Sequence, residues 1–361
     1  MLRSLFISMS LVLVFSLQAQ DKWTDDLHLQ FNYGQGYVLP EYDFINLLTQ
    51  GPTEVYELSL LKQSNGNTDW QLIYKYPAFG VRFQYASLGN PEVLGELWAL
   101  YPYFQIPIYE REKLEFNTEI GLGYCRVNQK FDLEDNFLNV AVGSYGNFHF
   151  NARFNLTYRI SDRIHLGTSL SLDHFSNGNT SEPNLGINFL NVLGGLSYRI
   201  GDERERLSTE LKPHEKTVER ELVFALGGKH SRALASTYYL TNSVSFEMRK
   251  KYFRALHLGV GADLFVDRSV EDQLQKQERG FQGSDQYQTG IHISQTLVYN
   301  RISISLQEGI YLGLTEQVEK YTIYNRGIFK YRVTDHFSAR LTMKSHLHIL
   351  DYPEIGIGWI W

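Results

Sequence analysis

The chain has 361 residues, of which 34 are Lys or Arg and 40 are Asp or Glu, giving a formal net charge of −6. This acidic balance offers no basic patch and argues against nucleic acid as a partner. Hydrophobic residues make up 43% of the chain, yet beyond the first twenty residues no apolar run approaches the roughly 18 residues of a transmembrane helix. Abundant Tyr (24) and Gly (29) are instead typical of membrane β-barrels, whose strands carry belts of aromatic side chains.

Residues 1–19 are predicted to form a secretory signal peptide. Arg3 supplies the positive charge at its start, Leu5–Phe15 is its apolar stretch, and Ala19 is the expected last residue before cleavage. The apolar stretch is too short to span a bilayer as a helix. No cysteine follows the expected cleavage position, so a lipoprotein is not indicated. The mature chain is therefore expected to cross the inner membrane of a Gram-negative bacterium.

Residues 20–200 are predicted to form about eight β-strands, because apolar and polar side chains alternate along them. In residues 164–172 one face is apolar and the other is small or polar. A strand of about ten residues with this pattern crosses a bilayer with one face toward lipid and the other toward the lumen of a barrel. The predicted strands cover residues 27–33, 53–61, 80–85, 94–106, 114–127, 145–158, 164–176 and 189–200.

Residues 201–220 interrupt the alternation. They are rich in charge and include Pro213. The segment is either a long exposed loop of one barrel or a linker between two modules, and the sequence supports both. One barrel of about sixteen strands and two smaller barrels therefore both remain open.

Alternation resumes in residues 221–361, where about eight further strands are predicted, among them residues 287–299 and 354–361. The chain ends with Ile355, Ile357, Trp359 and Trp361 at alternate positions. This ending resembles the terminal-strand signal that the outer-membrane assembly machinery recognises, so that machinery is an expected partner. The predicted fold class is all-β, an antiparallel transmembrane β-barrel of the outer-membrane type. The single cysteine, Cys125, is predicted to be a small packing residue.

The strand predicted at residues 164–176 ends with a histidine and a serine on its apolar face. A serine hydroxyl is a weak nucleophile at neutral pH and needs a base within hydrogen-bonding reach. His174 and Ser176 are separated by one residue, so they project to the same side, about 6–7 Å apart at the backbone. Asn177 and Gly178 follow directly and could donate hydrogen bonds to an oxyanion. Because this face of a barrel meets lipid, the pair is a candidate for chemistry on a lipid.

The stretch HFSNGNTSEPNLGIN, residues 174–188, resembles the outer-membrane lipid A 3-O-deacylases, also called acyloxyacyl hydrolases. Their motif is H-x-S-N followed by P-N-x-G-I. The positions that match it are His174, Ser176, Asn177, Pro183, Asn184, Gly186 and Ile187. The similarity extends through residues 139–147 and 195–200, so it covers roughly residues 110–200. The resemblance implies a Ser–His–Glu triad.

The glutamate of that triad lies fourteen residues after the histidine, and this position is Asn188 here. In a hairpin centred near Ser181, Asn188 is expected across from His174, with β-carbons about 5 Å apart. An asparagine can accept an imidazole N–H and fix the tautomer, but it supplies no negative charge. In chymotrypsin-type proteases the equivalent exchange of acid for amide costs roughly 10⁴ in turnover.

The resemblance implies an outer-membrane ester hydrolase that removes an ester-linked acyl chain from lipid A, the membrane anchor of lipopolysaccharide. Its catalytic residues would be Ser176 and His174, with Asn188 at the acid position, and no cofactor or metal is expected. The alternative is a non-catalytic barrel, a structural protein or small pore that kept the fold. Asn188 and the added second half favour this alternative. The sequence leaves open which acyl ester is cleaved and whether the protein forms a homodimer.

Overall fold

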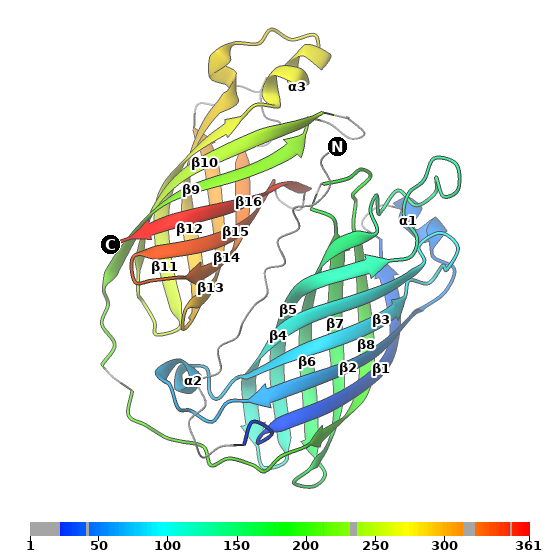
Figure 1. Cartoon of the computed structure of the whole chain (residues 1–361), viewed down its shortest axis with the longest axis vertical. Helices are drawn as coiled ribbons and strands as arrows, with labels where there is room; N and C mark the ends of the chain where they lie inside the picture. Colours follow the sequence, from blue (N-terminus) through cyan, green and yellow to red (C-terminus); the bar gives the residue numbers. More distant parts are fainter. Residues whose placement is uncertain are drawn as a thin grey trace.

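The computed structural model describes residues 22–40, 43–178, 180–211, 213–231, 237–312, 322–346 and 349–361. The described chain folds into two closed barrels, each of eight antiparallel strands (Figure 1). The predicted fold class is therefore confirmed, and of the two arrangements that the sequence left open the chain adopts two barrels. The signal peptide predicted at residues 1–19 lies outside the described residues.

The first barrel is a simple meander in which each strand pairs with the next and β8 closes on β1. Its strands are β1 (Leu27–Leu39), β2 (Thr53–Gln63), β3 (Ala78–Ser87), β4 (Glu96–Arg111), β5 (Leu114–Val127), β6 (Gly146–Arg159), β7 (Ile164–Ser176) and β8 (Ile187–Arg199). Two short helices, α1 (Asp43–Leu48) and α2 (Asp69–Ile73), lie in its connections.

The second barrel repeats this plan, with β16 closing on β9. Its strands are β9 (Val218–His230), β10 (Tyr238–Lys250), β11 (Leu256–Asp267), β12 (Tyr287–Tyr299), β13 (Ile302–Leu312), β14 (Ile323–Arg332), β15 (Phe337–His346) and β16 (Ile349–Ile360). The helix α3 (Val270–Lys276) and the 3-10 turn η1 (Gly283–Gln286) lie between β11 and β12. At the seam, Trp361 and Arg220 exchange two backbone hydrogen bonds, so the last residue helps to close the barrel.

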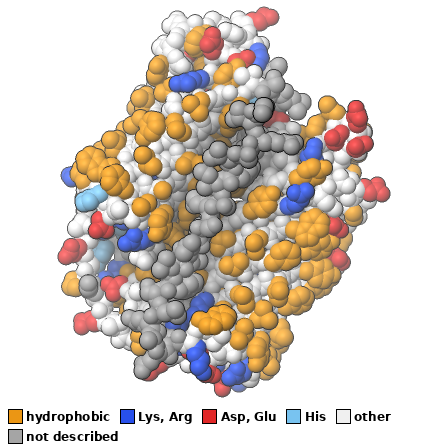
Figure 2. All heavy atoms as spheres, viewed as in Figure 1, with side chains coloured by type: hydrophobic (Ala, Val, Ile, Leu, Met, Phe, Trp, Pro, Cys, Tyr) orange, Lys and Arg blue, Asp and Glu red, His pale blue; other side chains and the backbone are white. Residues whose placement is uncertain are grey.

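The strands form because their side chains alternate between two environments. Along β11, Leu258, Val260 and Leu264 are exposed, whereas the residues between them are largely buried in the lumen. Hydrophobic side chains accordingly gather on the outer faces of both barrels (Figure 2). This is the arrangement of a barrel whose outside meets lipid. In the part of the chain that the structure describes, no helix is both long and apolar enough to cross a membrane.

Several predicted strands are longer in the structure than their alternation suggested, β1 and β16 among them. β1 continues six residues beyond Tyr33, through Gly34 and Gly36, where a Cβ would collide with the backbone of β8. Both glycines lie on the inner face of β1, and the apolar row on its outer face is interrupted at Gln35 while the strand continues. β16 begins before Glu354 because Asp351 points inward and pairs with Lys229 and Lys344.

Buried ion pairs fill the lumen of both barrels. In the first barrel, Glu57 pairs with Arg82 and Arg153, and Arg82 also pairs with Glu119. In the second barrel, Asp263 accepts hydrogen bonds from Arg326, His292, Tyr324 and Ser245. Charges out of water need partners of this kind to offset their desolvation. The lumens are therefore packed interiors at mid-height.

Each barrel has two distinct ends. We call "loop end" the end that carries the connections β1–β2, β3–β4, β5–β6 and β7–β8, and their counterparts in the second barrel. The opposite "linker end" carries the chain between Arg199 and Val218 (Figure 1). Arg204 donates to Asp26 at 2.8 Å and Leu207 donates to the carbonyl of Asn65 at 2.7 Å. The first part of the linker is thereby fixed across the linker end of the first barrel.

The barrels touch near the same end. The Tyr74 hydroxyl, just after α2, donates to the carbonyls of Ala255 and Val298 at 3.2 and 3.0 Å. Its ring lies 4.4 Å from the ring of Tyr299, centroid to centroid, and Phe104 packs edge-on against Tyr299 at 4.5 Å. Aromatic side chains thus join the two barrels laterally.

Candidate active site

The predicted pair lies at the loop end of the first barrel. His174 and Ser176 occupy the last positions of β7, and Asn188 is near the start of β8. The register pairs His174 directly with Asn188, as the sequence predicted. All three side chains are on the outer face, where they continue the apolar row of Leu170 and Leu172.

The three side chains form one hydrogen-bonded chain. The Nδ1 atom of His174 lies 2.8 Å from Oδ1 of Asn188, and its Nε2 atom lies 3.2 Å from Oγ of Ser176. An amide Oδ1 only accepts hydrogen bonds, so we assign the ring proton to Nδ1. Nε2 is then unprotonated and faces the serine hydroxyl. This is the arrangement in which an imidazole acts as general base toward a serine.

A carboxylate does lie next to the histidine in sequence, but it points the other way. Asp173 is fully buried in the lumen and accepts hydrogen bonds from His149 at 3.1 Å and Asn151 at 2.9 Å. Strand alternation places it on the opposite face of the sheet from His174. Asn188 is therefore the group that orients the histidine, and Asp173 is part of the packed interior.

A glycine backs the histidine and serine. Gly186 has φ of +73°, and a Cβ there would lie 2.9 Å from Cε1 of His174 and 3.2 Å from Cβ of Ser176. Its N–H donates to the carbonyl of Ala141 at 3.0 Å. Only glycine combines this backbone conformation with so close an approach. The backbone of the β7–β8 loop therefore fixes the position of the pair.

The β5–β6 loop supports the β7–β8 loop from the side. The Ser181 hydroxyl donates to the carbonyl of Gly143 at 3.0 Å, and a Cβ on Gly143 would lie 2.6 Å from Glu182 backbone atoms. Burial raises the pKa of the Glu182 carboxyl, and the charge of His230, at the loop end of β9, acts in the opposite direction. The two sequence stretches that resemble the deacylases, residues 139–147 and 174–188, are thus in contact.

The two predicted oxyanion donors differ in their surroundings. Asn177 is buried, its backbone N–H donates to Oδ1 of Asn184 at 2.8 Å, and its side-chain amide donates to the carbonyl of Ser181 at 2.7 Å. Asn177 therefore organises the loop. Gly178 has φ of +67°, and within the described chain its N–H donates to no residue. Its N–H is the freer donor, and the oxyanion role of both residues stays a prediction.

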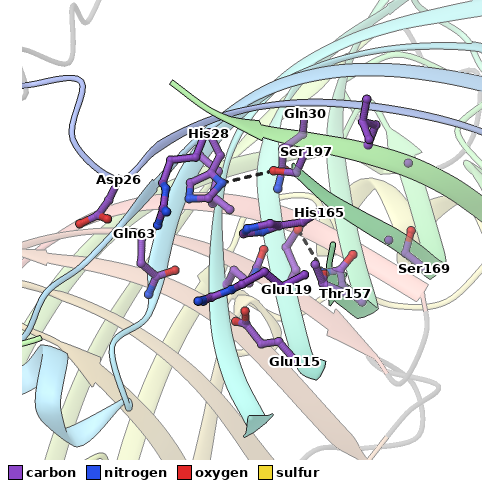
Figure 3. Close-up of a pocket in the computed structure, with 18 of the residues that line it drawn as sticks. Asp26, His28, Gln30, Gln63, Glu115, Glu119, Thr157, His165, Ser169 and Ser197 are labelled. Carbon is purple, nitrogen blue, oxygen red and sulfur yellow. Dashed lines mark hydrogen bonds between the residues drawn. The ribbon is translucent and has the colours of Figure 1, made fainter. Parts of the chain in front are cut away.

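A cavity of about 90 Å³ opens at the other end of the same barrel (Figure 3). His28 and His165 face each other there, with ring centroids 5.4 Å apart, and Arg82 and Glu119 also line it. In the part of the chain that the structure describes, no three His, Cys, Asp or Glu side chains are grouped to hold a metal. The cavity lies at the linker end and is remote from Ser176.

Comparison with known families assigns both barrels. Residues 54–197 match the family described as lipid A 3-O-deacylase (PagL). The first barrel belongs to the lipid A 3-O-deacylase family. Residues 218–361 match the acyloxyacyl hydrolase C-terminal domain. The resemblance carried by residues 174–188 is thereby confirmed, and the chain is an outer-membrane protein.

Solved structures match the chain at low identity. The outer-membrane enzyme PagL is 15% identical with a TM-score of 0.31, over 46% of this chain and 97% of that one. Neisserial surface protein A is 10% identical with a TM-score of 0.35, over 49% and 98%. A mutant porin of Rhodopseudomonas blastica is 7% identical with a TM-score of 0.18, over 93% and 99%. No curated protein matches the chain.

In outer-membrane barrels the longer loops are extracellular and the short turns periplasmic. The loop end of the deacylase domain is therefore the extracellular end, and the linker end is periplasmic. Ser176 then lies at the height of the outer leaflet. Sequence reasoning did not identify Gly186 and Gly143 as the residues that hold the site. The only sequence signal for them was their inclusion in the stretches that resemble the family.

Proposed function

We propose that the first barrel hydrolyses an ester-linked acyl chain of lipid A with Ser176 as nucleophile and His174 as general base. The observation that carries this proposal is the outward-facing chain Ser176–His174–Asn188, with its distances of 3.2 and 2.8 Å. A lipid that diffuses in the outer leaflet can reach these side chains without entering the barrel. The family's substrate, lipid A, fits this access.

The reaction has two halves. Oγ of Ser176 attacks the ester carbonyl carbon as its proton passes to Nε2 of His174, and the tetrahedral intermediate carries a negative oxygen. The imidazolium then gives this proton to the departing sugar oxygen, leaving the acyl group on Ser176. Water, deprotonated by His174, attacks the acyl-enzyme and releases the fatty acid. The Gly178 N–H is the proposed donor to the negative oxygen.

Asn188 sets the tautomer of His174 in this mechanism but leaves the imidazolium without a neighbouring negative charge. Turnover is therefore expected to be slower than with a glutamate at this position. The alternative function, a non-catalytic barrel, is favoured by the same substitution. A pore function is disfavoured, because the ion pairs among Glu57, Arg82, Glu119 and Arg153 occupy the lumen of the first barrel.

A serine-directed phosphonate with a long alkyl chain tests the nucleophile directly. We expect purified protein in detergent to form a covalent adduct on Ser176, located by peptide mass spectrometry. His174→Ala should lose the adduct because the hydroxyl then has no base. Ser345, on the outer face of β15, is a matched serine that should stay unlabelled. No adduct on Ser176, or equal labelling of Ser345, would favour the non-catalytic barrel.

A further inference from the structure

Positive charge is scarce at the extracellular end of the first barrel. The strand ends and loops there comprise residues 34–58, 83–103, 120–150 and 169–193. Across all four segments the sequence contains two basic residues, Arg126 and Lys130. Both lie in the third segment, Arg126 at the end of β5 and Lys130 in the loop that follows. A substrate with a negative headgroup therefore meets one cationic position on this rim.

The two cations converge on one aromatic ring. The guanidinium carbon of Arg126 and the Nζ atom of Lys130 each lie 5.5 Å from the centroid of Tyr145. Lys130 also lies 3.9 Å from a carboxylate oxygen of Asp132 and donates to the carbonyl of Phe131 at 3.1 Å. Arg126 is exposed on the outer face of β5 and forms no ion pair with a described residue. Because both cations contact the same ring, their like charges favour an anion close to it.

This cationic pair lies beside the proposed nucleophile. Ser176 pairs across the sheet with Phe148, and Phe148 pairs with Tyr124. Arg126 is two positions beyond Tyr124, opposite Gly146. With strands about 4.8 Å apart and a rise of about 3.4 Å per residue, the Cα atoms of Ser176 and Arg126 are roughly 12 Å apart. A sugar ring and the reach of an arginine side chain together span that gap.

The surface between them suits a sugar. Phe148 and Tyr124 are both exposed on the outer face, 40% and 56% respectively. A Cβ on Gly146 would lie 2.5 Å from the Tyr124 hydroxyl, and a Cβ on Gly178 would lie 3.3 Å from the Phe148 ring. The two glycines thus leave room for the rings of Tyr124 and Phe148 beside them. Aromatic faces of this kind accept the apolar face of a carbohydrate.

We propose that Arg126 and Lys130 form an anion subsite that binds a phosphate of the glycolipid whose ester lies at Ser176. The proposal rests on the proposed function, because it assumes that the ester lies at Ser176. Lipid A is a phosphorylated, acylated disaccharide, so ester and phosphate occur on one molecule. The planar Arg126 guanidinium can bind a phosphate through two parallel hydrogen bonds, and Lys130 adds a second positive charge. The subsite would position the sugar so that one particular ester reaches Ser176.

The test measures binding, so it does not depend on hydrolysis. Ser176→Ala protein in neutral detergent is titrated with phosphorylated lipid A and with lipid A from which the phosphates have been removed. Adding Arg126→Gln and Lys130→Gln should weaken binding of the phosphorylated lipid roughly tenfold or more, and leave the dephosphorylated lipid unchanged. The matched control is Arg111→Gln with Lys113→Gln, an exposed pair in the β4–β5 turn at the periplasmic end, which should change neither affinity.

Three results would overturn the subsite. The first is unchanged affinity for phosphorylated lipid A in the folded Arg126/Lys130 variant. The second is equal weakening for both lipids, which would assign the loss to packing. The third is a preference for phosphorylated over dephosphorylated lipid A that depends on added anionic phospholipid. That result would show that phosphates of surrounding lipids occupy Arg126 and Lys130. Hydrolysis by protein that retains Ser176 is a separate measurement. Absence of hydrolysis there would contradict the proposed function, whereas the binding results are obtained independently of it.

Discussion

The two barrels share one architecture but differ at the hairpin between their seventh and eighth strands. In the first barrel, the seventh and eighth strands are joined by the residues between Ser176 and Ile187, which pack against the β5–β6 loop. In the second barrel, β15 ends at His346 and β16 begins at Ile349. His346 points into the lumen, where its Nε2 atom lies 2.9 Å from the Tyr311 hydroxyl. The same end of the same fold thus carries an outward histidine in one barrel and an inward histidine in the other.

The comparison shows that the barrel and the site are separable. Both lumens are held by buried ion pairs, and both outer faces are apolar. What the first barrel adds is a loop whose backbone, through Gly186, reaches His174 and Ser176. Function is thus carried by a few residues that a common scaffold positions.

The largest effect is expected from restoring the missing charge. Asn188→Glu should raise the rate of lipid A deacylation at least tenfold, with roughly 10⁴ as the ceiling, because a carboxylate stabilises the imidazolium of His174. The rate is measured by release of free fatty acid from purified lipid A. Ser176→Ala should abolish the activity in both backgrounds. A folded Asn188→Glu protein with the rate of the native protein would show that Asn188 does not act on His174.

Breaking a lumenal ion pair should affect both barrels alike. Arg153→Met removes a partner of Glu57, and Arg326→Met removes a partner of Asp263. Each should lower the free energy of unfolding by about 3–5 kcal/mol, because a buried carboxylate loses a counter-charge. Heat-modifiable mobility on mild-detergent gels and denaturant titration would measure the loss. A loss in only one barrel would contradict the equivalence of the two interiors.

A smaller effect on deacylation is expected from substituting Gly186, the glycine packed against His174 and Ser176. Gly186→Ala places a Cβ 2.9 Å from His174 at a positive φ, and should reduce deacylation roughly 10- to 100-fold with the barrel still folded. The matched control is Gly327→Ala in β14, where a Cβ meets nothing within 4 Å. That variant should keep native activity. Equal losses of deacylation activity in the two variants would show that Gly186 does not position His174 and Ser176.

The smallest effect is expected at the contact between the barrels. Tyr74→Ala removes hydrogen bonds to Ala255 and Val298 and the packing against Tyr299. Deacylation should stay within about twofold, because the contact is at the end opposite Ser176. Protease cleavage within the linker, between Arg199 and Val218, should rise a few-fold as the barrels separate more often. A loss of activity beyond tenfold would instead tie the second barrel to catalysis.

The sequence predicted the strands well because membrane strands obey period-two alternation strictly. β5, β7 and β12 begin and end at the predicted residues. Prediction was weaker where a polar side chain interrupts the outer apolar row, as at Gln35 in β1, and where a lumenal charge such as Asp351 resembles a loop residue. The number of barrels could not be predicted, because closure depends on which distant strands pair.

The sequence predicted those features of the candidate site that depend only on the register of one hairpin. The pairing of His174 with Asn188 follows from a hairpin, and the structure has it. The support from Ala141 and Gly143 involves a different loop, so no local pattern could predict it. The buried engagement of Asn177 also depends on Asn184 and Ser181, which approach only when the loop folds.

We propose that the outward Ser176–His174–Asn188 chain hydrolyses lipid A. Mass spectrometry of lipid A incubated with purified native protein tests it most directly, with Ser176→Ala as the blank. We expect a lipid A product that has lost one ester-linked acyl chain, together with the matching free fatty acid, in the native sample alone. Intact lipid A after incubation with both the native protein and folded Asn188→Glu would rule out hydrolysis by Ser176.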